Sequence, residues 1–133
     1  MANISNYLEE RVLNHIFRGV ESTSPATLYL ALFLNNPTDA ATGTEVSGTD
    51  YARQTITFSA PTQDGDGKGT IKNNTEIEFP SAGSSWGLVT HAAIYDGLEG
   101  GNMYYYGPLA NPKDVQTSDI LKVLENELVL TLA

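Results

Sequence analysis

The residues that could carry acid–base chemistry are few in this sequence. The 133-residue chain holds two histidines, His15 and His91, and no cysteine. A hydrolytic triad needs a histidine within reach of a nucleophile and an orienting acid, and no G-x-S-x-G turn is present to expose a serine. His91 lies in "SSWGLVTHAAIYDG", among small and apolar residues. We therefore expect it to be packed in a strand or an interface, the alternative being a hydrolase that uses it as its base.

The segment "QDGDGKG" (residues 63–69) comes nearest to a metal site. Counted from Asp64, Asp66 and Gly69 fit positions three and six of a calcium loop. Lys68 and Thr75, however, stand where an oxygen ligand and a bidentate carboxylate are needed, and an ammonium group repels the ion. The absence of cysteine also excludes thiolate zinc sites. The sequence therefore predicts an acidic turn here, with no metal and no cofactor.

Charge and composition narrow the class of partner. Seven basic against sixteen acidic residues leave a net charge of −9, which repels phosphate backbones and anionic lipid, so we expect neither nucleic acid nor a membrane as partner. The first ten residues have no basic stretch and no unbroken apolar run, so no secretory signal is expected. The length and the 41% hydrophobic content predict one globular domain over residues 1–133.

The sequence predicts one helix followed by strands, and these elements must position any functional site. Residues 1–19 predict an N-terminal helix, with Asn3 or Ser5 as cap and Gly19 at the left-handed end position. Its apolar stripe contains Leu8, Val12 and Ile16. His15 lies beside this stripe and is expected to be an ordinary helix residue.

Beyond the helix, residues 26–133 predict an antiparallel β-sandwich of about seven or eight strands. Apolar runs or alternation mark segments 26–34, 51–60, 75–80, 88–96, 103–109, 120–124 and 128–132. A short helix starting at Ser118 competes with the strand at 120–124. Segments 35–50 and 61–69, rich in Gly, Thr, Asp and Pro, are expected to be linkers.

The central hairpin carries apolar residues on both of its faces. In the first strand, strict alternation puts one set of residues on one face (Val89, His91, Ala93 and Tyr95) and a second set on the other (Leu88, Ala92 and Ile94). In the second strand, it puts Tyr105 on the face opposite to Tyr104 and Tyr106. Such strands need a second cover, which could be the helix, a long loop or a neighbouring subunit. A further alternative is that Trp86 and the tyrosines form a platform on which a sugar stacks.

The order of segments resembles a family of small tailed-bacteriophage virion proteins often labelled tail fibre proteins. The resemblance rests on "MANISNYLEERVLNHIFRG", "SPATLYLALFLNNPTDAATGTEVSGTDYARQTITFSAP", "EIEFPSAGSSWGLVTHAAIYDGLEGGNMYYYGPL" and "ELVLTL". It implies a virion part without enzymatic activity, and it brings no catalytic residues. The label covers tail parts and capsid-decorating parts alike, so both locations stay open.

The observations and the resemblance together predict a non-enzymatic structural protein on the outside of a virion. The resemblance alone favours the tail as its location, with capsid decoration as the alternative. The expected partners are further copies of the chain and other virion proteins, with a host-surface glycan as the weaker alternative. The candidate core or interface residues are Leu8, Val12, Ile16, Trp86, Val89, His91, Ile94, Tyr95, Tyr104, Tyr105 and Tyr106.

Overall fold

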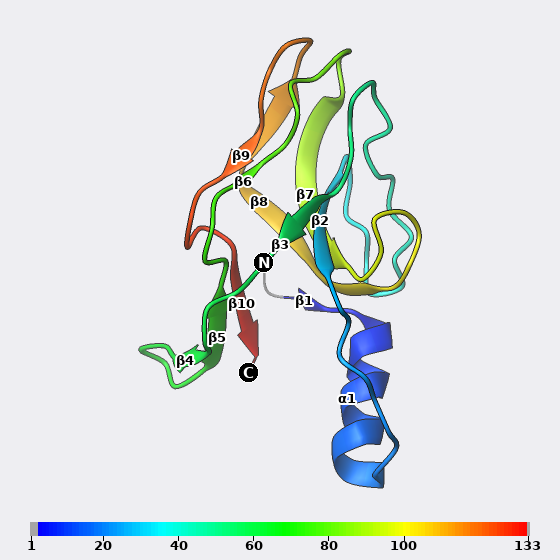
Figure 1. Cartoon of the computed structure of the whole chain (residues 1–133), viewed down its shortest axis with the longest axis vertical. Coiled ribbons are helices and arrows are strands. Elements are labelled where there is room, and N and C mark those ends of the chain that lie inside the picture. The colour runs from blue at the N-terminus through cyan, green and yellow to red at the C-terminus, as the bar shows by residue number, and fades with distance from the viewer. Residues whose placement is uncertain (1–2, 133) are drawn as a thin grey trace.

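The computed structural model of the chain describes residues 3–132 and is mainly β, with one helix near the N-terminus (Figure 1), as the sequence predicts. The strand count exceeds the expected seven or eight because β1, β4 and β5, at most four residues long, are too short to show alternation. The described elements are β1 (Asn3–Ile4), α1 (Asn6–Arg18), β2 (Leu28–Phe33), β3 (Gln54–Ile56), β4 (Thr62–Gln63), β5 (Gly69–Lys72), β6 (Ile77–Glu78), β7 (Gly87–Tyr95), β8 (Met103–Val115), β9 (Lys122–Val123) and β10 (Val129–Leu132).

The described strand pairs are all antiparallel and form three sheets. The largest has the order β1-β8-β7-β2-β3, and the smaller ones are β10-β5-β4 and β6-β9. Figure 1 shows α1 and the β10-β5-β4 sheet extending from the same end of the body as two separate arms. The main core joins one face of the large sheet to residues from the β6–β9 side, which gives a sandwich-like arrangement; its members include Leu30, Leu32, Ile77, Phe79, Trp86, Val89, Ala92, Ile94, Tyr105, Leu121 and Leu128.

The limits of α1 follow from its caps. Ser5 is the N-cap, and its hydroxyl accepts the backbone N–H of Leu8 at 3.2 Å. Gly19 ends the helix with a φ of 68°, a left-handed conformation that glycine adopts without strain. The expected helical segment 1–19 is therefore correct from residue 6 onward. Asn3 and Ile4 instead pair with Tyr106 and Tyr105 as β1, and Met1 and Ala2 lie outside the described residues.

Two expectations for loops and strand lengths were wrong, whereas the strand expected within 120–124 is confirmed as β9 over its competing helix. Segment 61–69 is not a plain linker, because β4 and β5 form a small hairpin across it. Segment 51–60 is a strand only over β3, and beyond it Phe58 makes an isolated bridge to Asn73. No helix starts at Ser118, which has a φ of 72°; the segment turns and continues into β9.

Strict alternation also failed in β7. The pairing of β7 with β8 shifts register between Val89 and His91. Between these two pairs lie one residue of β7, Thr90, and four residues of β8, 109–112, so the ladder is irregular here and the alternation of faces is interrupted. Val89 therefore lies in the main core with Ala92 and Ile94, and not on the face of Ala93 and Tyr95 as expected.

The large sheet does carry a second apolar face, but the chain covers that face itself. Its members, which we call the second cluster, are all at most 7% exposed: Ala31, Phe33, Ala93, Tyr95, Met103 and Tyr106. The cover is the segment 34–48, where Pro37 is fully buried and the Asp39 carboxylate accepts the Tyr106 hydroxyl. Gly43 fits so closely that an added Cβ would lie 3.0 Å from the Phe33 ring. The expected linker 35–50 is thus a packed loop, and the hairpin leaves no large apolar face for a neighbour.

Candidate functional site

His91 does not lie in a catalytic arrangement. It is partly buried in β7, between Phe33 of β2 and Pro108 of β8 in the sheet register. Its Nδ1 lies 2.7 Å from the hydroxyl of the adjacent Thr90, and burial lowers the pKa of its imidazole. Within residues 3–132 no carboxylate makes a hydrogen bond to the His91 ring that would orient it. His15 is exposed, with Nδ1 2.9 Å from the Val20 carbonyl oxygen at the end of α1.

The Asp64 carboxylate is hydrogen-bonded by backbone N–H groups of its own turn. Oδ1 of Asp64 accepts the backbone N–H groups of Asp66 at 2.8 Å and Lys68 at 2.9 Å, and these bonds lower the pKa of Asp64. This is the hydrogen-bonding pattern of an Asx turn. Across the described part of the chain, no group of three or more His, Asp or Glu side chains is arranged to hold a metal ion.

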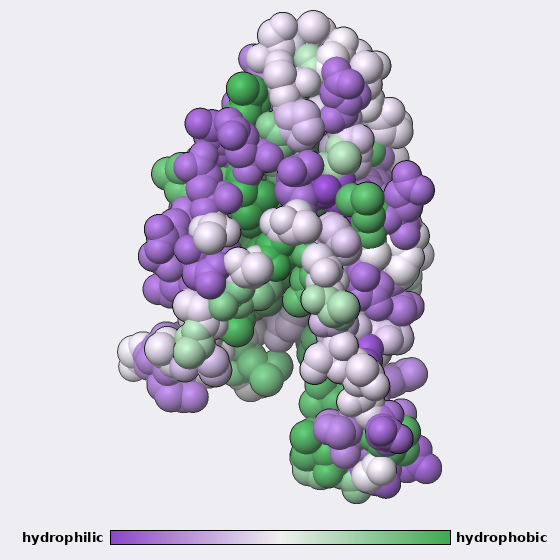
Figure 2. All heavy atoms as spheres, viewed as in Figure 1, coloured by the Kyte–Doolittle hydropathy of each residue, from purple (hydrophilic) through white to green (hydrophobic). Residues whose placement is uncertain are grey.

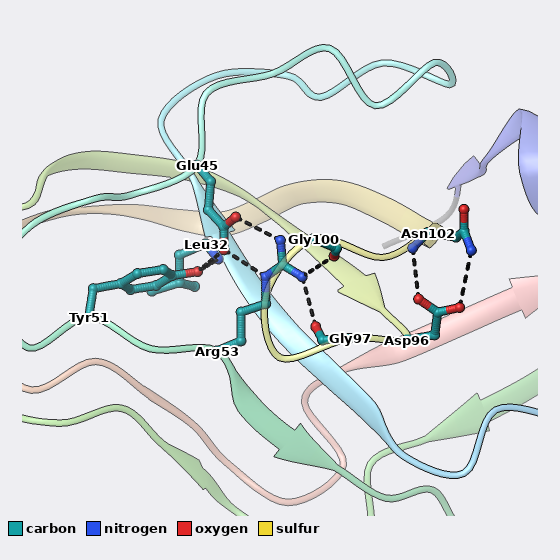
Figure 3. Close-up of polar contacts among 8 residues, drawn as sticks. All are labelled: Leu32, Glu45, Tyr51, Arg53, Asp96, Gly97, Gly100 and Asn102. Carbon is teal, nitrogen blue, oxygen red and sulfur yellow. Dashed lines mark hydrogen bonds and ion pairs between the residues drawn. The ribbon is translucent and has the colours of Figure 1, made fainter.

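A network of hydrogen bonds is centred on the buried side chain of Arg53 (Figure 3). Its guanidinium makes a bidentate contact with Glu45, at 2.9 Å and 2.8 Å, and donates to the carbonyls of Gly97 at 2.8 Å and Gly100 at 2.7 Å. The same group lies 4.0 Å from the centre of the Tyr95 ring, a cation–π distance. Four hydrogen bonds to two segments, together with the contact to the Tyr95 ring, leave Arg53 little capacity to bind a ligand.

Tyr51 completes this network. Its hydroxyl donates to Glu45 at 2.6 Å and accepts the Leu32 backbone N–H at 3.0 Å. Burial, and next the hydrogen bond to Glu45, raise the pKa of Tyr51 well above its usual value, so the hydroxyl stays a neutral donor. The Arg53 network therefore fixes the 34–48 loop and the β7–β8 turn onto the sheet. The sequence does not reveal this network, because Arg53 alternates with Thr55 and Thr57 in the pattern of a polar, solvent-facing side of a strand.

The aromatic residues proposed as a sugar platform are buried. Trp86 is 4% exposed, and its Nε1 donates to the Thr49 carbonyl at 2.9 Å. Tyr104, Tyr105 and Tyr106 are 5–8% exposed. A ring that stacks on a sugar must present a face to solvent, so the structure does not provide that platform.

An apolar groove lies between the large sheet and the segment 120–128. Its volume is about 590 Å³, and it is lined by Leu30, Ala92, Pro108, Leu109, Ala110, Asn111, Lys113, Ile120, Leu121, Lys122, Val123, Glu127 and Leu128. Its two lysines already have partners: Lys113 donates to the Ile120 carbonyl at 3.3 Å, and Lys122 lies 3.6 Å from both Glu76 and Glu78. The groove therefore offers mainly apolar contacts.

The helix α1 is attached to the body only near its start. The Ser5 backbone N–H donates to the Tyr104 carbonyl at 3.0 Å, and the Ser5 hydroxyl donates to the Met103 carbonyl. Leu8 packs against the main core. Arg11 donates to the Tyr104 hydroxyl at 2.6 Å and also to Ser22 and the Thr23 carbonyl, so it holds the returning segment 20–25 against the helix.

Beyond this attachment the helix exposes its apolar residues. No residue of α1 is buried, and Figure 2 shows hydrophobic residues gathered at the free end of the helix. The exposed side chains are Val12 (39%), Leu13 (56%), Ile16 (64%), Phe17 (77%) and, just past the helix, Val20 (44%). We call these five residues the helix patch. Within the described chain α1 is neither long nor apolar enough to cross a bilayer.

The structure thus divides the residues singled out from the sequence. Val12 and Ile16 are exposed on α1, whereas Leu8 and His91 are partly buried. The buried members are Trp86, Val89, Ile94, Tyr95, Tyr104, Tyr105 and Tyr106. The hairpin residues are therefore core, and the helix residues remain available to a partner. Leu13 and Phe17, which lie next to the stripe of Leu8, Val12 and Ile16 and broaden it, are exposed as well.

A family comparison covers almost the whole chain. Residues 3–131 match the family described as "Podophage GP4 fiber I protein gp80". The chain belongs to this fibre family. The resemblance to phage tail fibre proteins is thereby confirmed, and membership of the fibre family supports a structural, tail-associated role in a phage. No curated protein matches the chain.

Proposed function

We propose that this fibre-family protein is a non-enzymatic building block on the exterior of a tailed-phage virion. It is attached at the tail, is present in several copies, and contacts other copies of itself and other virion proteins. The observation that carries this proposal is the match of residues 3–131 to a podophage fibre family.

The chemistry of the described residues supports the same proposal. The groups that could act as acids, bases or ligands serve the fold: Asp64 closes a turn, and Arg53, Glu45 and Tyr51 fix loops to the sheet. A protein part that must hold its shape on a particle benefits from such loops, because loose segments lose entropy each time a contact forms.

Immunogold labelling of intact particles tests this function. An antibody raised against the purified chain is applied to particles of the phage that encodes it, and the position of the gold is recorded by electron microscopy. The proposal expects several labels per particle, all at the tail. Label over the head would favour the capsid-decorating alternative, and a chain absent from purified particles would reject a virion role.

A matched measurement addresses the absence of catalysis. The variant His91→Gln removes the one imidazole of the sandwich and is expected to leave particle assembly and infectivity unchanged. Loss of infectivity by a variant that still folds and still assembles would show that His91 has a chemical role.

A further inference from the structure

The helix patch gathers exposed apolar side chains on one short helix, whereas the other large apolar residues that the described chain exposes, such as Leu88, Leu98 and Leu124, lie on separate segments. The second cluster is closed by the 34–48 loop, and the main core is closed between the sheets. Phe17, by contrast, is 77% exposed, which is unusual for a large aromatic side chain in a folded protein. Neighbouring apolar residues on one helix face mark a docking surface more often than scattered ones do.

The patch is not the face that holds the helix to its own chain. Arg11, which binds Tyr104 and the returning segment 20–25, lies on the other side of α1. Val12 and Ile16 are four residues apart, as are Leu13 and Phe17, so the two pairs form adjoining rows on one face. The four patch residues on the helix therefore face away from the returning segment and stay open along the free part of the helix, whereas Val20, which begins that segment, lies at the edge of the patch next to Asn14.

The area of the patch matches what a small interface between two helices needs. With apolar side chains of roughly 150–200 Å² each when fully exposed, the exposed fractions of the five residues leave about 450–500 Å² on one copy. Two copies that covered each other's patch completely would bury at most about 900–1,000 Å², which reaches only the lower limit of roughly 1,000 Å² for specific interfaces. One such contact is weak alone and gains strength where many copies are held on one particle.

The charge distribution favours another copy of the chain as the occupant. The helix carries Glu9, Glu10, Arg11 and Arg18, and so has no net charge. The net charge of −9 therefore belongs to the rest of the chain. Two copies repel each other through their bodies but not through their helices, and an antiparallel overlap of helices about 20 Å long places the two bodies at opposite ends.

We propose that the helix patch is the surface by which two copies of this chain associate, helix against helix in antiparallel orientation. The inference rests on the proposed function, because a fibre component present in several copies needs a contact between copies. It assigns that contact to Val12, Leu13, Ile16, Phe17 and Val20, and not to the central hairpin.

Sedimentation velocity on the purified full chain, from about 5 to 200 µM, tests the association. The wild type is expected to shift from monomer towards dimer with concentration, and the shift grows with added salt because salt screens the acidic bodies. Phe17→Ser is expected to weaken the association at least tenfold. Leu98→Ser, at a 53% exposed site in the β7–β8 turn, is the matched control and is expected to sediment like the wild type.

Cross-linking tests the orientation, because the chain contains no cysteine of its own. Ile16→Cys is expected to form a disulfide dimer under mild oxidation, and Leu98→Cys is expected not to. An antiparallel pair also predicts a heterodimer when Val12→Cys and Val20→Cys are mixed, whereas a homodimer of Val12→Cys would overturn that orientation. Association without any link at position 16 would show that the helix docks elsewhere, for example in the apolar groove, and would reject the helix-to-helix contact.

The outcomes separate this inference from the proposed function. A chain that stays monomeric at 200 µM, or a Phe17→Ser variant that dimerises like the wild type, rejects the helix patch even when immunogold places the chain at the tail. A third outcome is that the wild type and Phe17→Ser are both monomeric, but only the wild type is incorporated into particles. The helix patch would then bind another virion protein, and the inference of a second copy would be wrong. A dimer through the patch in a chain absent from particles upholds the inference and rejects the virion role.

Discussion

Substitution of Arg53 tests directly whether its network holds the 34–48 loop and the β7–β8 turn to the large sheet. It is 8% exposed and joins Glu45 to the carbonyls of Gly97 and Gly100. The substitution Arg53→Met keeps the length and the apolar stem of the side chain but removes the charge and its donors. It leaves the Glu45 carboxylate with Tyr51 as its remaining recorded partner.

The expected loss of stability follows from how far Glu45 is sealed from water. Removing one partner of a buried ion pair costs about 3–5 kcal/mol when the other charge is left without solvent. The Glu45 side chain is 27% exposed, so water reaches part of it and the lower end of this range applies. We expect Arg53→Met to lower the free energy of unfolding by about 3 kcal/mol, from a total of roughly 5–15 kcal/mol for a domain of ordinary stability.

Urea unfolding followed by the fluorescence of Trp86 measures this loss, because Trp86 is the single tryptophan and is buried. With a slope of about 2 kcal/mol per molar urea, the midpoint should fall by about 1.5 M. Lys68→Met is the control, since it removes a positive charge from an exposed turn and should change stability by less than about 0.5 kcal/mol. If Arg53→Met costs no more than Lys68→Met, the Arg53 network does not hold the loops to the sheet and our reasoning is wrong.

Three further predictions concern single positions. Asn73 is 0% exposed, donates to the Thr75 and Leu124 carbonyls and accepts the Leu128 N–H, so Asn73→Ala should cost about 2–4 kcal/mol in the same assay. A Cβ at Gly48 would lie 2.3 Å from Trp86 Cδ1, so Gly48→Ala should displace the indole, shift its emission to the red and cost about 1–3 kcal/mol; unchanged emission would contradict this packing. Burial lowers the pKa of His91 below its ordinary 6.5, so its contribution to stability is complete above pH 6.5 and is lost as the pH falls towards the lower folded-state pKa. The difference in unfolding free energy between wild type and His91→Gln should therefore change between pH 8 and pH 5, and parallel pH profiles would show that the imidazole is not desolvated.

The helix and several strands could be predicted because their signals are local. Ser5 and Gly19 act on backbone groups within one turn of themselves, so the limits of α1 are encoded within a few residues. Ile77 and Phe79 alternate with glutamates and are buried as the pattern indicates. These features need no knowledge of what the segment packs against.

The features that could not be predicted depend on contacts between distant segments. The face that Val89 occupies departs from strict alternation because of an irregularity in the ladder, which exists only in the pairing of β7 with β8. The cover over Phe33 and Tyr106 comes from the 34–48 loop, whose composition is typical of a solvated linker. Arg53 is buried because Glu45, eight residues earlier, and the turn at Gly97 and Gly100 meet it in space.

These non-local contacts also change where an assembly contact can lie. From the sequence alone, the two-sided apolar hairpin was the surface that needed a neighbour, and α1 was a candidate cover for it. In the structure the 34–48 loop covers the second apolar face of the hairpin. Beyond Arg11, α1 therefore does not pack on the body, and it exposes Ile16 and Phe17. A 13-residue helix with few tertiary contacts is only marginally stable in water. The free half of α1 therefore has the most to gain from a partner, because the same contact would bury its apolar residues and stabilise its hydrogen bonds.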